Sequence, residues 1–281
     1  MIFNIIVDKK NIFNLIFLPL AVKIARQLKM FGFEVKSGPY VTTSACINII
    51  FGAHSNPLFW QSVADEQDIF VNCEPLYDSD WRLSNLDYVN LVRQSRVLEI
   101  YQDNKNWSRD PKILVLPPLF ESIANNKKFE FIDRNKKNIL FIGSINAKRR
   151  VFLEGLKDQL ADINCGFGIF GEELKKTIAR SSFFLNLNYY ENAMFNKYRF
   201  SLCLGSNSVY VGEIGQLTDD VDVFLKSALP MLKNEVCPKD IIDFMKDPLA
   251  VSNAMAAQHK AASLLENLFV DHLERAVSEW T

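Results

Sequence analysis

The chain has 281 residues, which is enough for about two domains with substantial buried cores. A hydrophobic content of 48% with 23% charged residues is typical of a globular protein and argues against a disordered chain. The formal net charge of −1 argues against nucleic acid as the main partner, so basic clusters must be interpreted as local sites.

The first half of the chain alternates between strand and helix patterns. Short apolar runs that end in turn residues predict strands, and apolar residues spaced three or four apart predict helices. The expected strands are residues 2–7, 33–36, 47–51, 68–73, 97–101 and 113–116, and the expected helices are 20–31 and 86–93. The apolar run at 12–25 is interrupted by Pro19 and Lys23 and is too short to span a membrane, so we expect no transmembrane segment.

A polar stretch at residues 121–137 is expected to be a surface linker. After it the alternation resumes, with helical stripes at Phe152, Leu156 and Leu160 and at Phe195, Tyr198 and Leu202, a strand at 221–225 and a helical tail at 238–280. The sequence therefore predicts two α/β domains, an N-terminal one at 1–125 and a C-terminal one at 126–281.

Residues 138–213 place polar side chains at the ends of successive predicted strands. The strand Ile-Leu-Phe-Ile-Gly at 139–143 ends in Gly143, which allows a sharp turn and a close approach to a ligand. Ser144 comes next, and Lys148 and Arg149 (with Arg150) lie at the start of the following helix, where N–H groups and cations can bind phosphate. The alternative is a solvated basic helix face.

Three further motifs complete this pattern: Phe-Gly-Ile-Phe-Gly-Glu-Glu-Leu at 167–174, Phe-Leu-Asn-Leu-Asn-Tyr-Tyr-Glu at 184–191 and Val-Tyr-Val-Gly-Glu at 209–213. Their order and spacing resemble the donor-binding half of GT-B glycosyltransferases of the broad group 1, family 4-like type. The resemblance covers nearly all of residues 138–260 and, more loosely, 1–117. It implies two Rossmann-like domains facing across a cleft, with the acceptor on the N-terminal domain and a nucleotide sugar on the C-terminal one. It also implies that the last helix returns towards the first domain.

The resemblance assigns a role to Glu191. Group 1 enzymes begin a Glu-x7-Glu pattern here, in which the first carboxylate binds sugar hydroxyls and the second holds the ribose. Glu191 matches the first position, but the second is Arg199, which cannot accept hydrogen bonds from a ribose. Arg199 is instead expected to bind phosphate or nucleotide, and Glu213 is expected to supply the ribose contact. The alternatives are a helix cap for Glu191, a surface ion pair for Arg199 and an ordinary loop carboxylate for Glu213.

Three other residues follow predicted strands. Glu172 lies at the start of a predicted helix, after a predicted strand at 168–170. In the family this turn lies near the nucleotide base. The alternative is that Glu172 only stabilises the first turn of the helix, where acidic residues are common. His54 ends the run Gly-Ala-His at 52–54 and is a candidate to orient the donor sugar or shuttle a proton. Glu74 is a candidate base for the acceptor hydroxyl. A structural histidine is the alternative for His54.

We expect no metal ion or other cofactor. Asp78 and Asp80 form an Asp-x-Asp pair, but turn-forming residues flank them, and such aspartates need no ligand. The five cysteines are scattered and the chain has three histidines, which disfavours a zinc site and predicts reduced thiols and a cytoplasmic protein. The sequence lacks the Gly-x-Gly-x-x-Gly motif that would support a nicotinamide-dependent enzyme.

The predicted function is therefore that of a metal-independent glycosyltransferase. The resemblance implies transfer from a nucleotide sugar to a glycan or lipid-linked glycan in bacterial surface polysaccharide synthesis, in the cytoplasm, with room for peripheral contact with the inner face of the membrane. A nucleotide-sugar epimerase and a non-catalytic nucleotide-binding assembly subunit are the alternatives, because fold does not fix function.

Overall fold

The computed structural model of the chain describes residues 1–120, 138–160, 163–166, 168–189, 193, 195–204, 206, 208–217, 232–233 and 235–281. These residues form two compact units. Unit 1 comprises Met1–Leu116 together with Asn267–Thr281, and unit 2 comprises Pro117–Glu266. The units differ from the predicted domains, 1–125 and 126–281, because the C-terminal segment belongs to unit 1. The predicted linker at 121–137 lies outside the described residues.

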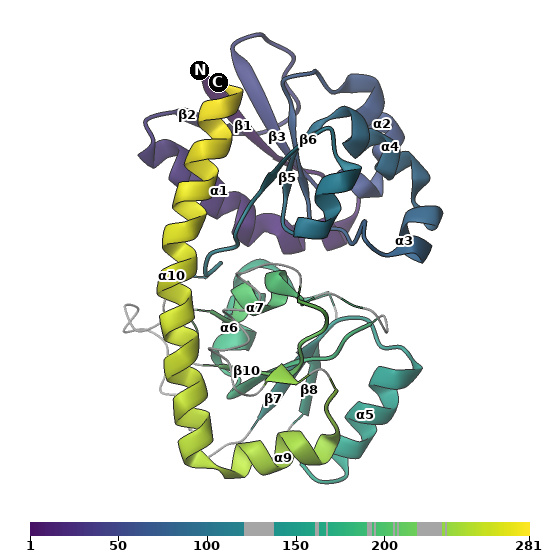
Figure 1. The fold of residues 1–281 in the computed structure, drawn as a ribbon, viewed down its shortest axis with the longest axis vertical. Helices are drawn as coiled ribbons and strands as arrows, with labels where there is room; N and C mark the ends of the chain where they lie inside the picture. Colours follow the sequence, from purple (N-terminus) through teal and green to yellow (C-terminus); the bar gives the residue numbers. More distant parts are fainter. Residues whose placement is uncertain are drawn as a thin grey trace. The chain divides into compact units, whose positions relative to one another are not determined.

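Unit 1 contains a six-stranded parallel sheet with the order β2-β1-β3-β4-β5-β6 (Figure 1). Its strands are β1 (Ile2–Val7), β2 (Glu34–Ser37), β3 (Cys46–Phe51), β4 (Ile69–Asn72), β5 (Arg96–Glu99) and β6 (Asp110–Ile113). Its helices are η1 (Ile12–Phe17), α1 (Leu18–Met30), η2 (Ala53–Ser55), α2 (Pro57–Val63), α3 (Ser79–Ser84), α4 (Leu86–Gln94) and η3 (Gln102–Trp107). The order reverses between β1 and β3, and open α/β sheets bind ligands outside the carboxyl ends of strands at such a switch point.

Helices cover this sheet, so its central strands are buried and mostly apolar, with single buried asparagines at Asn4, Asn48 and Asn72. All residues of β3 are buried. The strand residues Ile6, Ile50, Phe70 and Val97 share one buried cluster with residues of α2 and α4, while α1 contacts β1 and β2. Burial on both faces removes the alternation of polar and apolar residues, which explains why these strands appear in the sequence as continuous apolar runs.

The last strand of unit 1 is not where the sequence placed it. The predicted strand at 113–116 overlaps β6 (Asp110–Ile113) at one residue, and residues 114–116 are buried outside the strand. β6 pairs only with β5 and contains Pro111. An edge strand tolerates proline and charged side chains, and the apolar pattern therefore missed it.

Unit 2 contains a five-stranded parallel sheet with the order β11-β10-β9-β7-β8. Its strands are β7 (Ile139–Ile142), β8 (Ile163–Gly166), β9 (Phe183–Asn186), β10 (Val209–Glu213) and β11 (Leu232–Lys233). Its helices are α5 (Ala147–Lys157), α6 (Gly171–Ala179), α7 (Lys197–Cys203), α9 (Pro238–Lys246) and the first part of α10 (Pro248–Trp280). In chain order this is the strand arrangement of the first five strands of unit 1, and its switch point lies between β7 and β9.

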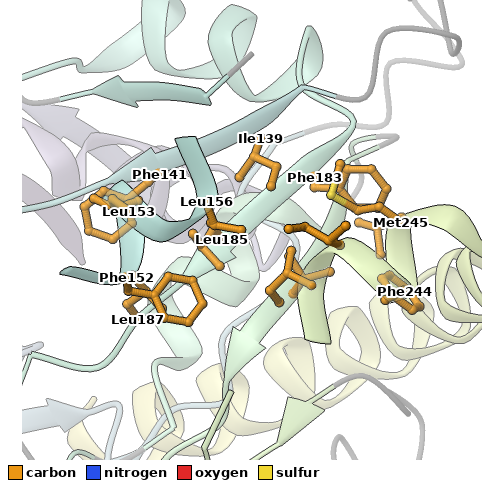
Figure 2. Packing of buried hydrophobic residues seen from close by; sticks show 14 of the residues in the cluster. Ile139, Phe141, Phe152, Leu153, Leu156, Phe183, Leu185, Leu187, Phe244 and Met245 are labelled. Carbon is orange, nitrogen blue, oxygen red and sulfur yellow. The ribbon is translucent and has the colours of Figure 1, made fainter. Parts of the chain in front are cut away.

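The core of unit 2 packs helices α5 and α9 against the sheet (Figure 2). Phe141 and Leu185 from the sheet share this cluster with Phe152 and Leu156 of α5 and with Phe244 of α9. The α5 residues recur at a spacing of four, which places them on one helix face. Full burial of one such side chain contributes about 2–3 kcal/mol, so this face fixes how α5 lies on the sheet.

Of two strand predictions in unit 2, one is wrong and the other lies outside the described residues. The strand predicted at 168–170 is wrong, because β8 (Ile163–Gly166) precedes it. Gly168 has a φ of +70° and Gly171 a φ of +57°, values that do not fit a strand. β8 is an edge strand with exposed side chains, which hid its pattern. The strand predicted at 221–225 lies outside the described residues.

Helix α10 runs for 33 residues and belongs to both units, since the division between units 1 and 2 falls within it. Its last part is tied to β6. The Trp280 indole N–H donates to Asp110 Oδ2 (2.6 Å), and the Arg96 guanidinium donates to the Trp280 carbonyl (3.3 Å). Lys112 forms an ion pair with Glu279 at the same edge.

Among the described residues, no helix combines the length and the apolarity that crossing a bilayer requires. All five cysteines are free thiols, as expected for reduced cysteines. Cys46 and Cys203 are buried, whereas Cys165 and Cys237 are exposed.

Candidate functional site

Gly143 ends β7 at the switch point of unit 2, and its backbone lies against a guanidinium group. Its φ of +143° falls in the region that favours glycine. A Cβ added here would lie 2.4 Å from Arg199 Nη2 and 3.6 Å from Arg149 Nη1. The absence of a side chain at Gly143 is therefore what lets the Arg199 guanidinium approach the end of β7, while Arg149 lies at van der Waals distance.

Arg199 is positioned by two asparagines. Asn196 caps α7, where its Oδ1 accepts the Arg199 backbone N–H (2.9 Å). The Arg199 guanidinium donates from Nη1 to Oδ1 of Asn186 (3.2 Å), the buried last residue of β9. Arg199 thus comes from α7 but places its charge between the ends of β7 and β9.

Arg149 is buried, so it does not lie on a solvated basic helix face, which was the alternative to phosphate binding. Its side chain donates from Nη1 to the Ser144 carbonyl (2.6 Å) and from Nη2 to the Leu187 carbonyl. The guanidinium carbon lies 5.0 Å from the ring centroid of Tyr189 and 5.4 Å from that of Phe141. In this structure Arg149 ties the turn after β7 to the segment after β9.

A carboxylate and a lysine meet beside these arginines. Lys148 Nζ lies 2.7 Å from Glu213 Oε1, and Glu213 Oε2 accepts the backbone N–H of Asn188 (2.6 Å). The Lys148 side chain is 54% exposed and that of Glu213 only 3%. The expected ribose ligand Glu213 therefore already holds a cation and a main-chain amide, while Lys148 remains open to solvent.

The predicted donor-side residues do not all meet. The edge formed by β7, β9 and β10 brings together Gly143, Ser144, Lys148, Arg149, Arg199 and Glu213. Glu172 is an exposed first-turn residue of α6, which follows β8, and no recorded contact joins it to this group. Glu191 lies outside the described residues, so its role stays a prediction.

Sequence reasoning missed Asn186, which connects the two halves of this edge. It accepts from Arg199 and donates from Nδ2 to the Glu213 carbonyl (2.6 Å). The signal was available, because asparagines at 186 and 188 interrupt an otherwise apolar run where a strand ends. A buried amide there needs polar partners, which predicts a network of hydrogen bonds.

Unit 1 has its own polar group at the β1/β3 switch point. His54 lies in η2, directly after β3, and its Nδ1 is 3.3 Å from Glu74 Oε1. The two side chains are 24% and 20% exposed. The edges of Phe17 and Tyr88 enclose the imidazole at ring-centroid distances of 6.1 and 6.0 Å. The sequence named His54 and Glu74 separately, and the structure makes them a pair.

Burial raises the pKa of Glu74, and the nearby His54 opposes this effect. A carboxylate with a raised pKa is a better proton acceptor than an exposed one. Glu74 can thus accept a proton while its carboxylate lies 3.3 Å from the His54 imidazole.

The predicted Asp-x-Asp pair has a structural role at its first member. Asp78 caps α3 and accepts the Trp81 backbone N–H at Oδ1 (2.7 Å), and Asp80 lies in the first helical turn. Within the described part of the chain, no three His, Cys, Asp or Glu residues are grouped to hold a metal ion.

Comparison with known proteins reveals a shared fold. No protein-family model matches the chain, and no curated protein matches it by sequence. Among solved structures, the chain is similar to the DNA-modifying enzyme β-glucosyltransferase, solved with and without its substrate uridine diphosphoglucose. The TM-score is 0.54 at 11% identity, over 98% of each chain. OtsA, solved in its apo form, gives a TM-score of 0.39 at 12% identity over 96% of this chain and 77% of that one, which is too low to support an argument.

The two parallel sheets and the similarity to β-glucosyltransferase confirm the predicted fold class, an α/β protein with two Rossmann-like units as in the GT-B fold. The narrower group 1 resemblance stays a prediction.

Proposed function

We propose that the chain is a glycosyltransferase that moves a sugar from a nucleotide-sugar donor to a glycan or lipid-linked glycan, as in the synthesis of bacterial surface polysaccharides. The observation that carries this proposal is the approach of Arg199 to Gly143 at the β7/β9 switch point. A guanidinium beside a backbone turn at a strand end offers phosphate both charge and main-chain N–H groups. The fold is shared with a glucosyltransferase whose substrate is a nucleotide sugar.

On the donor side, transfer breaks the bond between the sugar C1 and the phosphate oxygen, and the electron pair leaves with the nucleotide. We assign neutralisation of this charge to Arg199 and the exposed Lys148, so that no metal is needed. Glu191 would hold sugar hydroxyls and Glu172 would lie near the base, as the resemblance implies. Glu213 would contact the ribose with the same carboxylate that forms the ion pair with Lys148.

On the acceptor side, the attacking hydroxyl must lose its proton. The His54–Glu74 pair is the group of unit 1 that we assign to this step. Glu74, with its raised pKa, would accept the proton, and His54 would stabilise the charge or pass the proton on.

A surface of unit 1 supports a peripheral contact with a membrane carrying a lipid-linked acceptor. Lys10 Nζ lies 4.0 Å from the centroid of the Phe59 ring. This contact joins the segment just before η1 to α2. Neither residues 9–13 nor 57–63 contain an acid. We call this surface the η1–α2 patch; its exposed members are Lys9, Lys10, Ile12, Phe13, Leu58 and Phe59. Apolar side chains beside lysines suit an anionic lipid surface.

The deciding experiment begins with a thermal-shift panel of nucleotides and nucleotide sugars, because a bound ligand raises the apparent stability. The donor that binds is then incubated with glycan, lipid-linked glycan and duplex DNA acceptors, with and without EDTA. We expect transfer to a glycan that survives EDTA, and a large loss of transfer in Glu191→Gln with nucleotide binding retained. Loss in EDTA with recovery on Mg²⁺ would contradict metal independence.

Two outcomes would replace the proposal. Conversion of the donor sugar without any acceptor would identify an epimerase. Nucleotide binding with no sugar release under any acceptor would identify a non-catalytic binding subunit.

A further inference from the structure

Two buried asparagines hold the loop that carries Glu74. Asn72, at the end of β4, accepts the Glu74 backbone N–H at its Oδ1 (2.9 Å). Asn104 of η3 accepts the Tyr77 backbone N–H at its Oδ1 (3.1 Å) and donates from Nδ2 to the Glu74 carbonyl (2.8 Å). Both backbone polar groups of Glu74 are therefore held by side chains from neighbouring elements.

One carboxylate accepts hydrogen bonds from both asparagines, and the Oδ1 of Asn72 also accepts the Tyr88 hydroxyl (3.0 Å). Glu99, the fully buried last residue of β5, accepts at Oε2 from Asn72 Nδ2 (2.8 Å) and from Asn104 Nδ2 (3.1 Å). Its Oε1 accepts from the Ser108 hydroxyl (2.5 Å). An ionised carboxylate only accepts hydrogen bonds, so each amide must turn its NH₂ toward Glu99. That choice leaves both Oδ1 atoms facing the Glu74–Tyr77 loop.

We propose that Glu99 is a positioning residue whose ionised carboxylate, acting through Asn72 and Asn104, holds Glu74 against His54. A protonated Glu99 presents an O–H donor to the same amides, competes with their NH₂ groups and frees them to turn away from the loop. Unit 1 then contains a proton-dependent control of the His54–Glu74 pair. The functional value of this control rests on the proposed transfer reaction, but the control itself does not.

The electrostatic surroundings place this switch near neutral pH. Burial raises the pKa of Glu99 to about 7, although hydrogen bonds from Ser108, Asn104 and Asn72 oppose the effect. The titratable groups around it are Cys73 and Glu74 after β4 and Tyr88 on α4. Burial, together with the charges of Glu74 and Glu99, raises the pKa of the Cys73 thiol and of the Tyr88 hydroxyl. Cys73 and Tyr88 therefore stay neutral while Glu99 titrates.

The test follows the backbone amide signals of Glu74 and Tyr77 by ¹⁵N NMR in the full chain, from about pH 5 to about pH 9. In the wild type both signals should move with a common midpoint near the Glu99 pKa of about 7. Glu99→Gln should abolish this step. The matched control is Asp68→Asn, which also changes a buried carboxylate bound to an asparagine, Asn48, and should leave the step in place.

A second variant guards against a Glu99→Gln protein that fails to fold. The hydrogen bond from Ser108 stabilises the charged form of Glu99, so Ser108→Ala should move the midpoint to higher pH. Wild-type amides that do not move near pH 7, a step that survives in Glu99→Gln, or a midpoint unchanged by Ser108→Ala would each overturn the proposal.

Activity separates this inference from the proposed function. If transfer is established, Glu99→Gln should lower kcat about fivefold, since a neutral acceptor holds the asparagines less strongly. Nucleotide affinity should not change. No transfer in the wild type, together with the expected amide titration, would remove the proposed function and leave the Glu99 control standing.

Discussion

Arg199 and Arg149 both reach the end of β7, but their partners give them different roles. Arg199 contacts an asparagine side chain and the Gly143 backbone, whereas Arg149 is bound to two main-chain carbonyls. We therefore expect Arg199→Ala to weaken nucleotide-sugar binding by about 1.5–3 kcal/mol, the range for hydrogen bonds to charged groups. Isothermal titration calorimetry measures this loss.

Two variants of α5 serve as controls for Arg199→Ala. Arg150 is exposed on the same helix as Arg149, and Arg150→Ala should change neither affinity nor stability. Arg149→Ala leaves the Ser144 and Leu187 carbonyls without their donor and should lower the free energy of unfolding by about 2–4 kcal/mol. A stable Arg149→Ala protein with weakened nucleotide binding would restore Arg149 as a ligand.

The buried Glu99 also predicts how stability depends on pH. Its pKa rises from 4.5 to about 7 on folding, so the folded protein binds a proton that the unfolded chain has lost. The stability contributed by Glu99 is complete below about pH 4.5 and is lost as the pH rises through 7. Between these limits the wild type should lose about 3 kcal/mol relative to Glu99→Gln. Urea denaturation at both ends of this range tests the expectation, and parallel pH profiles for the two proteins would contradict it.

The limits of the sequence are visible at Arg149 and His54. Three successive basic residues look alike in a list, but 149 lies three, four and seven positions before the buried residues 152, 153 and 156. That spacing puts Arg149 on the inward face of α5, a signal that was present and unused. The pairing of His54 with Glu74 could not be predicted from the sequence, because it depends on the contact between the two loops that follow β3 and β4.

At the scale of elements, the η1–α2 patch predicts binding to anionic vesicles. Each lysine near a negative surface contributes about 1 kcal/mol, so Lys9→Glu with Lys10→Glu should weaken binding by tenfold or more, on the order of the lost charge interaction. Co-sedimentation with phosphatidylserine vesicles measures this. Leu249→Ser, at an exposed apolar residue of unit 2, should have no effect. Equal sedimentation of the charge-reversed and wild-type proteins would contradict the role of the patch.

The elements that the sequence predicted well are those with a strong periodic signal. The strands at 2–7 and 209–213 have the predicted bounds. Helix α1 begins two residues before and ends one residue before the prediction, and α4 ends one residue after it. β6 and β8 were misplaced because edge strands carry polar side chains and a proline that the pattern treats as loop. The short helices η1, α2 and α3 have too few turns to show a period.

At the scale of the whole molecule, both units repeat the same order of five strands, and each places its candidate residues at the switch point. The sequence supported two similar domains, since apolar runs recur in both halves. The resemblance implied that the last helix returns towards the first domain, and Asn267–Thr281 does belong to unit 1. Periodicity alone could not show this, because it depends on contacts between residues far apart in the chain, such as His272 Nδ1 with the Ile113 carbonyl (3.0 Å).

The contacts of Trp280 make unit 1 depend on that segment. Its side chain is 8% exposed and bonds to Asp110 on β6. Trp280→Ala should cost about 3 kcal/mol or more and should raise hydrogen exchange in β5 and β6. Lys260→Ala, at an exposed residue of the unit 2 part of α10, is the matched control and should leave this exchange unchanged. Protection of β6 that survives Trp280→Ala would show that the edge stands alone.

The division of α10 between the units has a consequence for synthesis on the ribosome. The strands of unit 1 emerge first, but the segment Asn267–Thr281 that covers their edge emerges only after all of unit 2. Until then β6 presents an unpaired edge, and an uncovered edge strand invites pairing with another chain. The nascent protein can therefore aggregate during the time that unit 2 takes to be translated. Its need for chaperones should fall when a peptide of Asn267–Thr281 is supplied in trans.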